Sequence, residues 1–325
     1  MGSAGEIVRT FAGLGRTGRT RDGSATSGNE VALSHIRKVR TMLTLKKLLL
    51  PVDYSQRCLS AAECVEVLAK CCVPQVTVLH VTGEGAQRDT GEIGYSSGAQ
   101  GSIPRADFTA ALGHLLAGLD VVFTESPGDP ARGIVEYAQE HGTDLIVMPT
   151  RGHGALRRFL LGSVTAKVLH DAGCPVWTGV HTDEDQGPRK CTGIRHVACG
   201  VDLGPQSGRV LQWAADLAAA FDARLTVVHA GTQLEPVIGV VHDPEWRAHV
   251  WKATEEQLSG LLQKSGIKAE TKLAPGEPAK AVAGAVGEIG ADVLVIGRTP
   301  DGLLGRLRTN AYAIIRQSPR PVVSV

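Results

Sequence analysis

The chain has 325 residues, 43% hydrophobic and 21% charged, which is long enough for two domains of ordinary size. Its 34 Lys and Arg nearly balance 33 Asp and Glu, and a formal net charge of +1 gives no reason to expect nucleic acid or a membrane surface as a partner. No apolar run approaches the ~18 residues of a membrane span. Seven cysteines without a secretory signal favour a reducing, cytoplasmic compartment.

The first 42 residues differ in composition from the rest of the chain. Residues 1–42 carry seven Arg or Lys against three Asp or Glu, several glycines and little apolar periodicity. This composition predicts a disordered basic tail. Aromatic residues are absent beyond Phe11, which disfavours nucleic-acid binding. Translation from Met42 is an equally open alternative.

From residue 43 onward, apolar strands alternate with helical segments. A strand in Leu-Leu-Leu-Pro-Val-Asp (48–53) leads to a helix over 55–72, and a second strand covers 77–81. Residues 83–104 form a long Gly/Ser-rich loop, which predicts either a lid or a disordered segment. Further helices are expected around 112–119, 131–141 and 163–172, and further strands over 145–148 and 175–180.

Four cysteines lie on or just after the first helix. Cys58, Cys64, Cys71 and Cys72 lack the paired Cys-x-x-Cys spacing of a zinc site. They are predicted to be small buried hydrophobic residues. The adjacent pair Cys71-Cys72 leaves a redox role open, although nothing nearby in the sequence supports it.

The same order of elements occurs twice. Segments 47–53, 77–81, 144–148 and 175–177 return as 196–202, 226–230, 292–296 and 321–323, at offsets of 149, 149, 148 and 146 residues. A nearly constant offset predicts a tandem duplication. We assign 1–42 to the tail, 43–180 to a first domain, 181–193 to a linker and 194–325 to a second domain. In the second, Asp243-Pro244 starts a helix that is expected to run to about Lys264.

Alternating strands and helices predict the α/β class, with two open, doubly wound parallel sheets of Rossmann-like type. Ligands of such sheets bind outside the carboxyl ends of the strands. Asp53, Val81 and the loop after Met148 all lie at strand ends of this kind. Three strand ends are therefore expected to converge on one site.

The loop after Met148 has the composition of a phosphate site. Gly152 is followed, after nine residues, by Gly162-Ser163 at the start of a predicted helix. Phosphate groups need backbone N–H donors that can approach closely, which glycine permits, and a helix N-terminus favours negative charge. The order of strand, glycine loop and helix start is more specific than two glycines alone.

This segment resembles the nucleotide-binding signature Gly-x2-Gly-x9-Gly-Ser/Thr of the universal stress protein family, with Pro149 in place of the first glycine. Proline has no N–H, so a contact made by that amide is lost. The resemblance covers roughly 44–180 and 194–325. It implies that the chain binds ATP, with Mg²⁺ held through the phosphates and water. Residues at the strand ends would contact adenine, and residues of the loop and helix start would contact the phosphates. The implied site residues are Pro51, Val52, Asp53, Val81, Met148, Gly152, Gly162, Ser163, Val164 and Thr165.

The second copy of the motif is degenerate. It reads Gly297-Arg298-Thr299-Pro300, nine residues, then Asn310-Ala311. Pro300 removes an N–H donor, Asn310 places a side chain at the close-approach position, and Ala311 lacks the serine hydroxyl. We expect no ATP there. The retained Asp202 suits helix capping or a remnant adenine pocket.

The resemblance also implies association through the last strands. Family members commonly pair at these edges, here 175–180 and 321–325, and an uncovered apolar edge promotes aggregation. Pairing within one chain predicts an intramolecular pseudo-dimer. A homodimer is left open.

We therefore expect a nucleotide-sensing regulatory or protective module in the stress response, whose ATP-dependent change an unknown protein partner detects. Two alternatives stand. One is a slow ATP hydrolase, although the chain lacks a Gly-x4-Gly-Lys-Ser/Thr loop. The other is a nucleotide-free interaction scaffold, which applies if Pro149 has disabled the first site as well.

Overall fold

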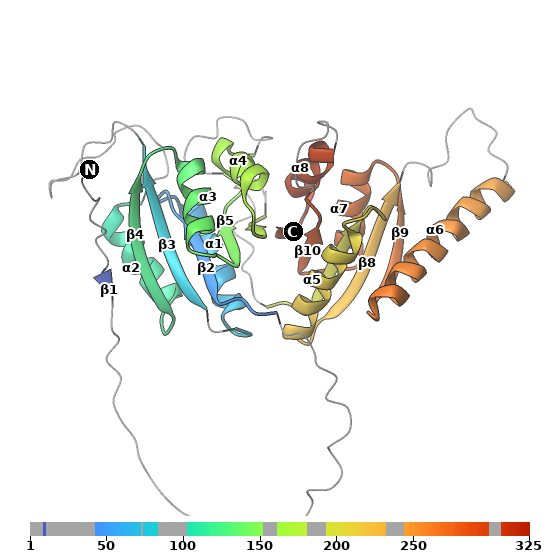
Figure 1. Ribbon diagram of the computed structural model, residues 1–325, viewed down its shortest axis with the longest axis horizontal. Coiled ribbons are helices and arrows are strands. Elements are labelled where there is room, and N and C mark those ends of the chain that lie inside the picture. The colour runs from blue at the N-terminus through green and yellow to red at the C-terminus, as the bar shows by residue number, and fades with distance from the viewer. Residues whose placement is uncertain are drawn as a thin grey trace, which may run out of the picture.

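A computed structural model describes residues 9–10, 43–72, 74–83, 103–151, 161–180, 193–231, 244–298 and 307–325. Within them, the strands form one continuous 11-stranded sheet in the order β1-β4-β3-β2-β5-β6-β11-β10-β7-β8-β9. The two repeats lie side by side and each contributes one half of the sheet (Figure 1). The α/β class and the doubly wound, mostly parallel sheet are confirmed.

The elements of the first repeat are β2 (Lys47–Pro51), α1 (Gln56–Leu68), β3 (Gln75–Thr82), α2 (Arg105–Leu115), β4 (Asp120–Pro127), α3 (Pro130–Glu140), β5 (Leu145–Met148), α4 (Ser163–Asp171) and β6 (Val176–Thr178). Strands β2 to β6 are parallel, and the short β1 (Arg9–Thr10) pairs antiparallel with β4. Helix α1 ends four residues earlier than its periodicity predicts. The carbonyl of Leu68 accepts the amides of both Cys71 and Cys72, which closes a tight final turn ahead of Pro74.

The second repeat follows the same order with β7 (His196–Val201), α5 (Ser207–Ala220), β8 (Arg224–Gly231), α6 (Pro244–Ser265), β9 (Glu270–Pro275), α7 (Pro278–Glu288), β10 (Val293–Ile296), α8 (Leu307–Gln317) and β11 (Val322–Ser324). All its strand pairs are parallel. Among the described helices, none is long and apolar enough to cross a membrane.

The two repeats meet through their last strands, as the sequence predicts. β6 and β11 pair antiparallel, with Trp177 opposite Val323. The hydroxyl of Thr178 donates to the carbonyl of Val322 (3.1 Å), and that of Ser324 donates to the carbonyl of Val176 (3.3 Å). Both hydroxyl side chains are fully buried. The intramolecular pseudo-dimer is therefore confirmed, with a reciprocal pair of side-chain bonds at its centre.

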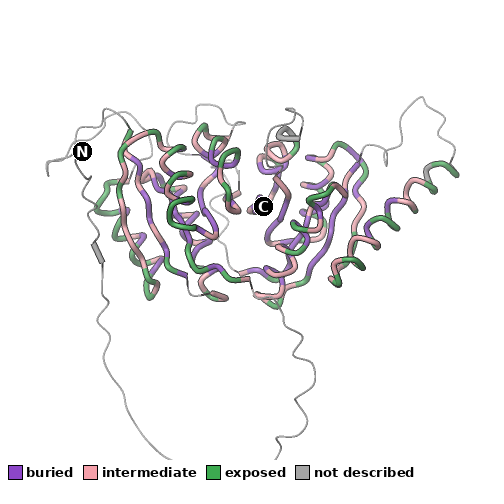
Figure 2. Tube along the Cα trace, viewed as in Figure 1, coloured by how far each residue is buried: buried purple, intermediate pink, exposed green. Residues whose placement is uncertain are grey.

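Each face of the sheet carries one hydrophobic core that extends across this seam. Helices α1, α2, α5 and α6 supply the core on one face, and α3, α4, α7 and α8 supply the core on the other. Figure 2 shows the buried strands between the two layers of half-exposed helices. Because both cores contain residues of both repeats, the seam is part of the interior of one molecule.

The repeats also share contacts that their sequences alone do not reveal. Oδ2 of Asp144 accepts the amides of Lys46 and Lys47, at 2.7 and 2.9 Å. In the second repeat, Oδ2 of Asp292 accepts the amides of Arg195 and His196, at 2.8 and 3.0 Å. The aspartate before the fourth strand of each repeat thus holds the start of the first strand.

His196 gives the fold a dependence on pH. Burial lowers the pKa of His196, the charge of Arg224 lowers it further, and Glu270 and Asp292 oppose the change. Because the unfolded chain takes up this proton at higher pH than the folded one, the free energy of unfolding is expected to fall as pH drops below about 6.5. Urea unfolding between pH 7 and pH 5 measures this slope. His196→Gln is expected to flatten it, whereas His114→Gln, on an exposed helix position, leaves it unchanged.

Candidate functional site

The predicted site lies at the carboxyl edge of the first repeat, where β2, β3 and β5 end. Pro51 is the last residue of β2 and Met148 the last of β5, and Val81 is the penultimate residue of β3. The structure therefore brings these predicted residues to one edge. Val52 and Val81 are each only 8% exposed, so they form an apolar floor more than an open surface.

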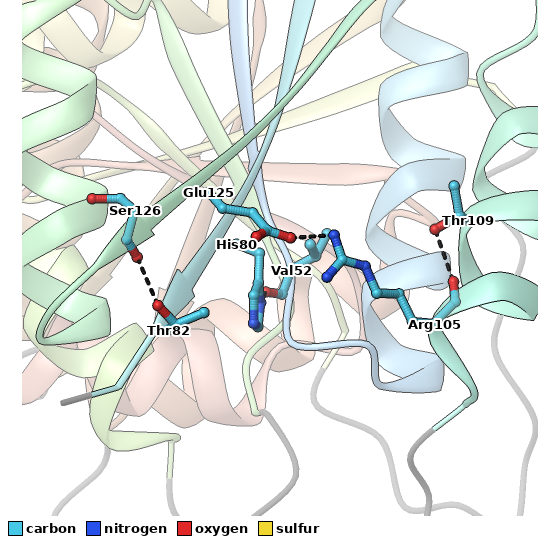
Figure 3. A network of polar contacts seen from close by, with 7 residues as sticks. All are labelled: Val52, His80, Thr82, Arg105, Thr109, Glu125 and Ser126. Atoms are coloured by element: carbon cyan, nitrogen blue, oxygen red, sulfur yellow. Dashed lines mark hydrogen bonds and ion pairs between the residues drawn. The ribbon is translucent and has the colours of Figure 1, made fainter. Parts of the chain in front are cut away.

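The backbone of Val52 is fixed by β3. Its amide donates to the carbonyl of Leu79 (2.8 Å), and its carbonyl accepts a hydrogen bond from Nδ1 of His80 (2.8 Å; Figure 3). In the second repeat, Nδ1 of His229 makes the same contact with the carbonyl of Val201, at 2.9 Å. Our sequence analysis missed His80 as a site residue. The signal was its recurrence as His229, one residue before the end of the matching segment.

Asp53 shapes the turn between β2 and α1. Its Oδ1 accepts the amide of Ser55 (3.0 Å) and the thiol of Cys58 (3.1 Å). Tyr54, which lies between Asp53 and Ser55, has a φ of 62°, in the left-handed region that is strained for a residue with a side chain. Asp53 thus holds the turn ahead of α1, whose N-cap is Ser55, and does not itself cap the helix.

The second repeat builds the same turn with different side chains. Oδ1 of Asp202 accepts the amide of Gly204 (2.8 Å) and the hydroxyl of Ser207 (2.9 Å), and Leu203 has a φ of 60°. Ser207 occupies the position of Cys58, so an O–H donor replaces an S–H donor. The matched geometry makes the second repeat an internal control for the first.

We expect Asp53→Ala and Asp202→Ala to destabilise the protein to a similar extent. Each removes an acceptor that holds a strained turn just ahead of a helix, and the loss of a typical net hydrogen bond costs about 1 kcal/mol. Chemical unfolding of the two variants measures the free energies. A much larger loss for Asp53→Ala alone would contradict the equivalence of the two turns.

An aromatic and charged cluster surrounds the first turn. The Tyr54 ring lies 4.5 Å from the His80 ring and 5.3 Å, edge-on, from the Phe108 ring, between centroids. The Arg105 guanidinium lies 5.7 Å from the Tyr54 centroid and pairs with Glu125 (Figure 3). Burial raises the pKa of Tyr54, so its hydroxyl stays protonated at neutral pH.

The chain returns to this turn after the predicted lid. The amide of Ile103 donates to the carbonyl of Tyr54 at 3.1 Å. Residues 84–102, which make up most of the predicted lid, lie outside the described residues. The described chain at Ile103 is thus attached directly to the turn that follows Asp53.

Helix α4 begins at the predicted phosphate site. Gly162 is its N-cap, and the Gly162 amide donates to the carbonyl of Thr150 at 2.9 Å. The Thr165 hydroxyl donates to the carbonyl of Pro149 at 3.0 Å. These two bonds tie the start of α4 to the end of β5, so the Thr165 side chain is committed to the protein. Ser163, by contrast, is exposed in the first turn.

The amides of the first helical turn are the donors available to an anion. An α-helix leaves its first N–H groups without partners in the helix, and α4 starts with Ser163, Val164 and Thr165. Gly152, the remaining predicted residue, lies outside the described residues. In the second repeat Asn310 is exposed on α8, and Pro300 also lies outside them.

Packing restricts the first signature position in the second repeat. A Cβ on Gly297, the second-repeat equivalent of Pro149, would lie 3.0 Å from Cγ2 of Val210, which is tighter than most Cβ contacts. Val210 therefore favours glycine at this position. The residue 149 positions before Val210, in the first repeat, is the smaller Ala61.

Two further features bear on what the site can hold. Among the described residues, no group of three or more His, Cys, Asp or Glu side chains could hold a metal ion. A groove of about 500 Å³ lies elsewhere, between β9 and α7, and an ion pair of Lys272 and Glu288 (2.8 Å) is part of its wall. None of the predicted site residues lines this groove.

Comparison with known proteins finds a family that matches both repeats. The model of the universal stress protein family matches residues 44–178 and 193–325, once for each repeat. A universal stress protein of Methanocaldococcus jannaschii is 53% identical over 49 residues, which cover 15% of this chain and 29% of that protein. One from Mycobacterium tuberculosis is 34% identical over 110 residues, 33% of this chain and 35% of that protein. The matched stretches thus span about a third of the length of these relatives.

A solved structure shows the same fold over most of the chain. The crystal structure of a universal stress protein from Archaeoglobus fulgidus covers 87% of this chain and 97% of its own, with a TM-score of 0.58 and 20% identity. At this identity the likeness concerns the fold alone.

Proposed function

Because this chain belongs to the universal stress protein family, we propose that its first repeat binds ATP as a regulatory ligand and that its second repeat has lost this ability. The observation that carries the proposal is the start of α4. It places a glycine cap and a run of helical amides at the edge where β2, β3 and β5 end. This is where open α/β sheets bind ligands.

The phosphates of ATP are proposed to lie at the N-terminus of α4. The first-turn amides of Ser163, Val164 and Thr165 donate toward the ligand, and the helix dipole favours its negative charge. Ser163 adds an exposed hydroxyl. Mg²⁺ is proposed to bridge the phosphates and water without a carboxylate ligand from the protein. Gly152 is proposed to complete the cradle.

The adenine end is proposed to lie against the ends of β2 and β3. Val52 and Val81 supply nearly buried apolar contacts, and Pro51 and Met148 end the neighbouring strands. The Asp53 carboxylate, at the carboxyl end of β2, is proposed to accept a hydrogen bond from the nucleoside. Asp53→Ala is then expected to weaken ATP binding, and Asp202→Ala is not.

Nucleotide content tests this proposal directly. The full chain is purified without added ligand and denatured, and the released adenine nucleotides are counted per chain. About one ATP per chain is expected, with no loss in Asp202→Ala. A chain that carries none and does not bind Mg-ATP on titration sinks the proposal. Phosphate release in the same samples separates binding from slow hydrolysis.

A further inference from the structure

Two adjacent thiols lie just beyond the end of α1. Sγ of Cys71 and Sγ of Cys72 are 3.4 Å apart, and each also lies 3.1 Å from the carbonyl oxygen of Leu68. Both side chains are half-buried. Two soft sulfur atoms therefore face one another at a partly accessible point of the surface.

The two thiols influence each other's ionisation. Either thiol can donate to the other, and this contact, together with the amide of Leu45, lowers the pKa of Cys72. The same bond raises the pKa of Cys71. Burial raises the pKa of Cys58 and Cys174. Within the pair, Cys72 is thus the thiol that ionises first and Cys71 the one that keeps its proton longer.

The spacing suits chelation better than a disulfide. At a sulfur–ion bond length of about 2.3 Å, sulfurs 3.4 Å apart subtend about 95° at a shared atom. That is the angle of a pyramidal, three-coordinate centre with a lone pair. A disulfide needs its sulfurs at about 2.05 Å, and its Cα atoms usually lie at least about 4.4 Å apart, whereas neighbouring residues have theirs at about 3.8 Å.

We propose that Cys71 and Cys72 form a dithiol site for a trivalent arsenical, R–As=O. The two thiols replace the oxygen, so that two S–H bonds and the As=O bond break, two As–S bonds form and one water molecule leaves. Arsenic stays trivalent and no electrons are transferred. Cys72 attacks first as thiolate, and Cys71 closes the chelate and supplies its proton to the departing oxygen. Two protein donors suffice because the organic group fills the third position.

This site is separate from the proposed ATP site. Cys71 and Cys72 follow the C-terminal end of α1, whereas Asp53 and Cys58 lie at its other end. The Leu45 amide precedes β2, so the pair lies at the amino edge of the sheet. Loss of either function does not require loss of the other.

Phenylarsine oxide provides the test. The reduced full-length chain is titrated with it and weighed by intact mass spectrometry. One adduct per chain is expected, formed with loss of one water and removed by a dithiol but not by an equal concentration of a monothiol. Cys71→Ser and Cys72→Ser are each expected to weaken binding at least ~100-fold, because the second bond of a chelate acts at high effective concentration. Cys174→Ser serves as the matched control and retains full binding.

Two readouts keep the result independent of folding. Circular dichroism is expected to be unchanged in each serine variant, and iodoacetamide is expected still to modify Cys72 in Cys71→Ser. The proposal is overturned if the wild type takes up no arsenical. It is also overturned if the double variant, with both Cys71→Ser and Cys72→Ser, still binds the arsenical with wild-type affinity. Rapid closure of the reduced pair to a disulfide in air, ahead of arsenical binding, also overturns it in favour of a redox pair.

Discussion

Gly162→Asp is expected to lower the affinity for ATP at least ~100-fold without destabilising the protein. Gly162 is the N-cap of α4, with a φ of −59° and a ψ of 144°. Any residue adopts this conformation, and aspartate is among the best N-caps. Its carboxylate can accept a first-turn amide and interacts favourably with the helix dipole. The variant is therefore expected to be as stable as the wild type, or up to ~1 kcal/mol more stable.

The same carboxylate is expected to exclude the ligand. It occupies the proposed position of a phosphate, uses the donors that a phosphate needs there and adds a like charge beside a polyanion. A loss of about 2.7 kcal/mol in binding free energy corresponds to the expected 100-fold change. An effect of this kind separates the anion site from the fold, since most variants that abolish binding also weaken the protein.

Gly162→Asn is the matched control. Asparagine caps a helix nearly as well and has the same shape, but it carries no charge. Its ATP affinity is expected to fall less than that of Gly162→Asp, with a similar melting temperature. Isothermal titration with Mg-ATP measures affinity and thermal unfolding measures stability. Equal ATP affinity in the wild type and Gly162→Asp would show that the phosphates bind elsewhere.

The sequence predicts the strands that are buried on both faces and the helices with strong periodicity. β5 and β10 are continuous apolar runs, and the predicted helix from Asp243 agrees with α6 to within a residue or two. β4 and β9 were missed. They lie toward the outer sides of the sheet and, apart from the buried Ala274, all their residues are half-exposed or exposed, so neither has the apolar run that identifies a central strand.

The sequence predicts only part of the candidate site, because some of its contacts are local and others join residues far apart in the chain. Strand ends and helix starts are local, so Asp53 and Gly162 could be placed from their neighbours. The roles of His80 and Thr165 depend on backbone carbonyls 28 and 16 residues away. Periodicity carries no information on such pairs. The contacts of Arg298, 124 and 129 residues away in sequence, were the least predictable of all.

Arg298 belongs to the degenerate loop of the second repeat, yet it reaches into the first. Its Nη1 donates to the carbonyl of Leu169 (3.0 Å) and its Nη2 to that of Cys174 (2.5 Å), at the C-terminal end of α4. Tyr312 on α8 donates to the carbonyl of Ala166 on the same helix, at 2.9 Å. Arg298, from the degenerate copy of the motif, thus clamps the helix that is proposed to bind phosphate.

Arg298→Ala is expected to lower the free energy of unfolding by about 3 kcal/mol. Two carbonyls at the seam lose charge-assisted donors, which contribute about 1.5 kcal/mol each or more. Burial lowers the pKa of Arg298, and its Nε has no hydrogen-bond partner among the described residues, so part of this gain is offset by desolvation. Tyr312→Phe removes one neutral bond and is expected to cost about 1 kcal/mol. Urea unfolding followed by tryptophan fluorescence measures both, since Trp177 is buried at the seam.

Arg298→Lys separates charge from geometry. A lysine ammonium is a compact charge and cannot span two carbonyls as the planar guanidinium does, so most of the loss is expected to remain. Ordinary surface substitutions change the free energy of unfolding by up to ~0.5 kcal/mol. A change no larger than this for Arg298→Ala would show that the contacts of Arg298 contribute nothing to stability. If ATP binds at the start of α4 as proposed, this helix is held at its C-terminus by the second repeat and at its N-terminus by the ligand. Any coupling between the two is reciprocal: ATP stabilises the seam by the same factor by which Arg298→Ala weakens ATP binding, about five-fold for a coupling of 1 kcal/mol.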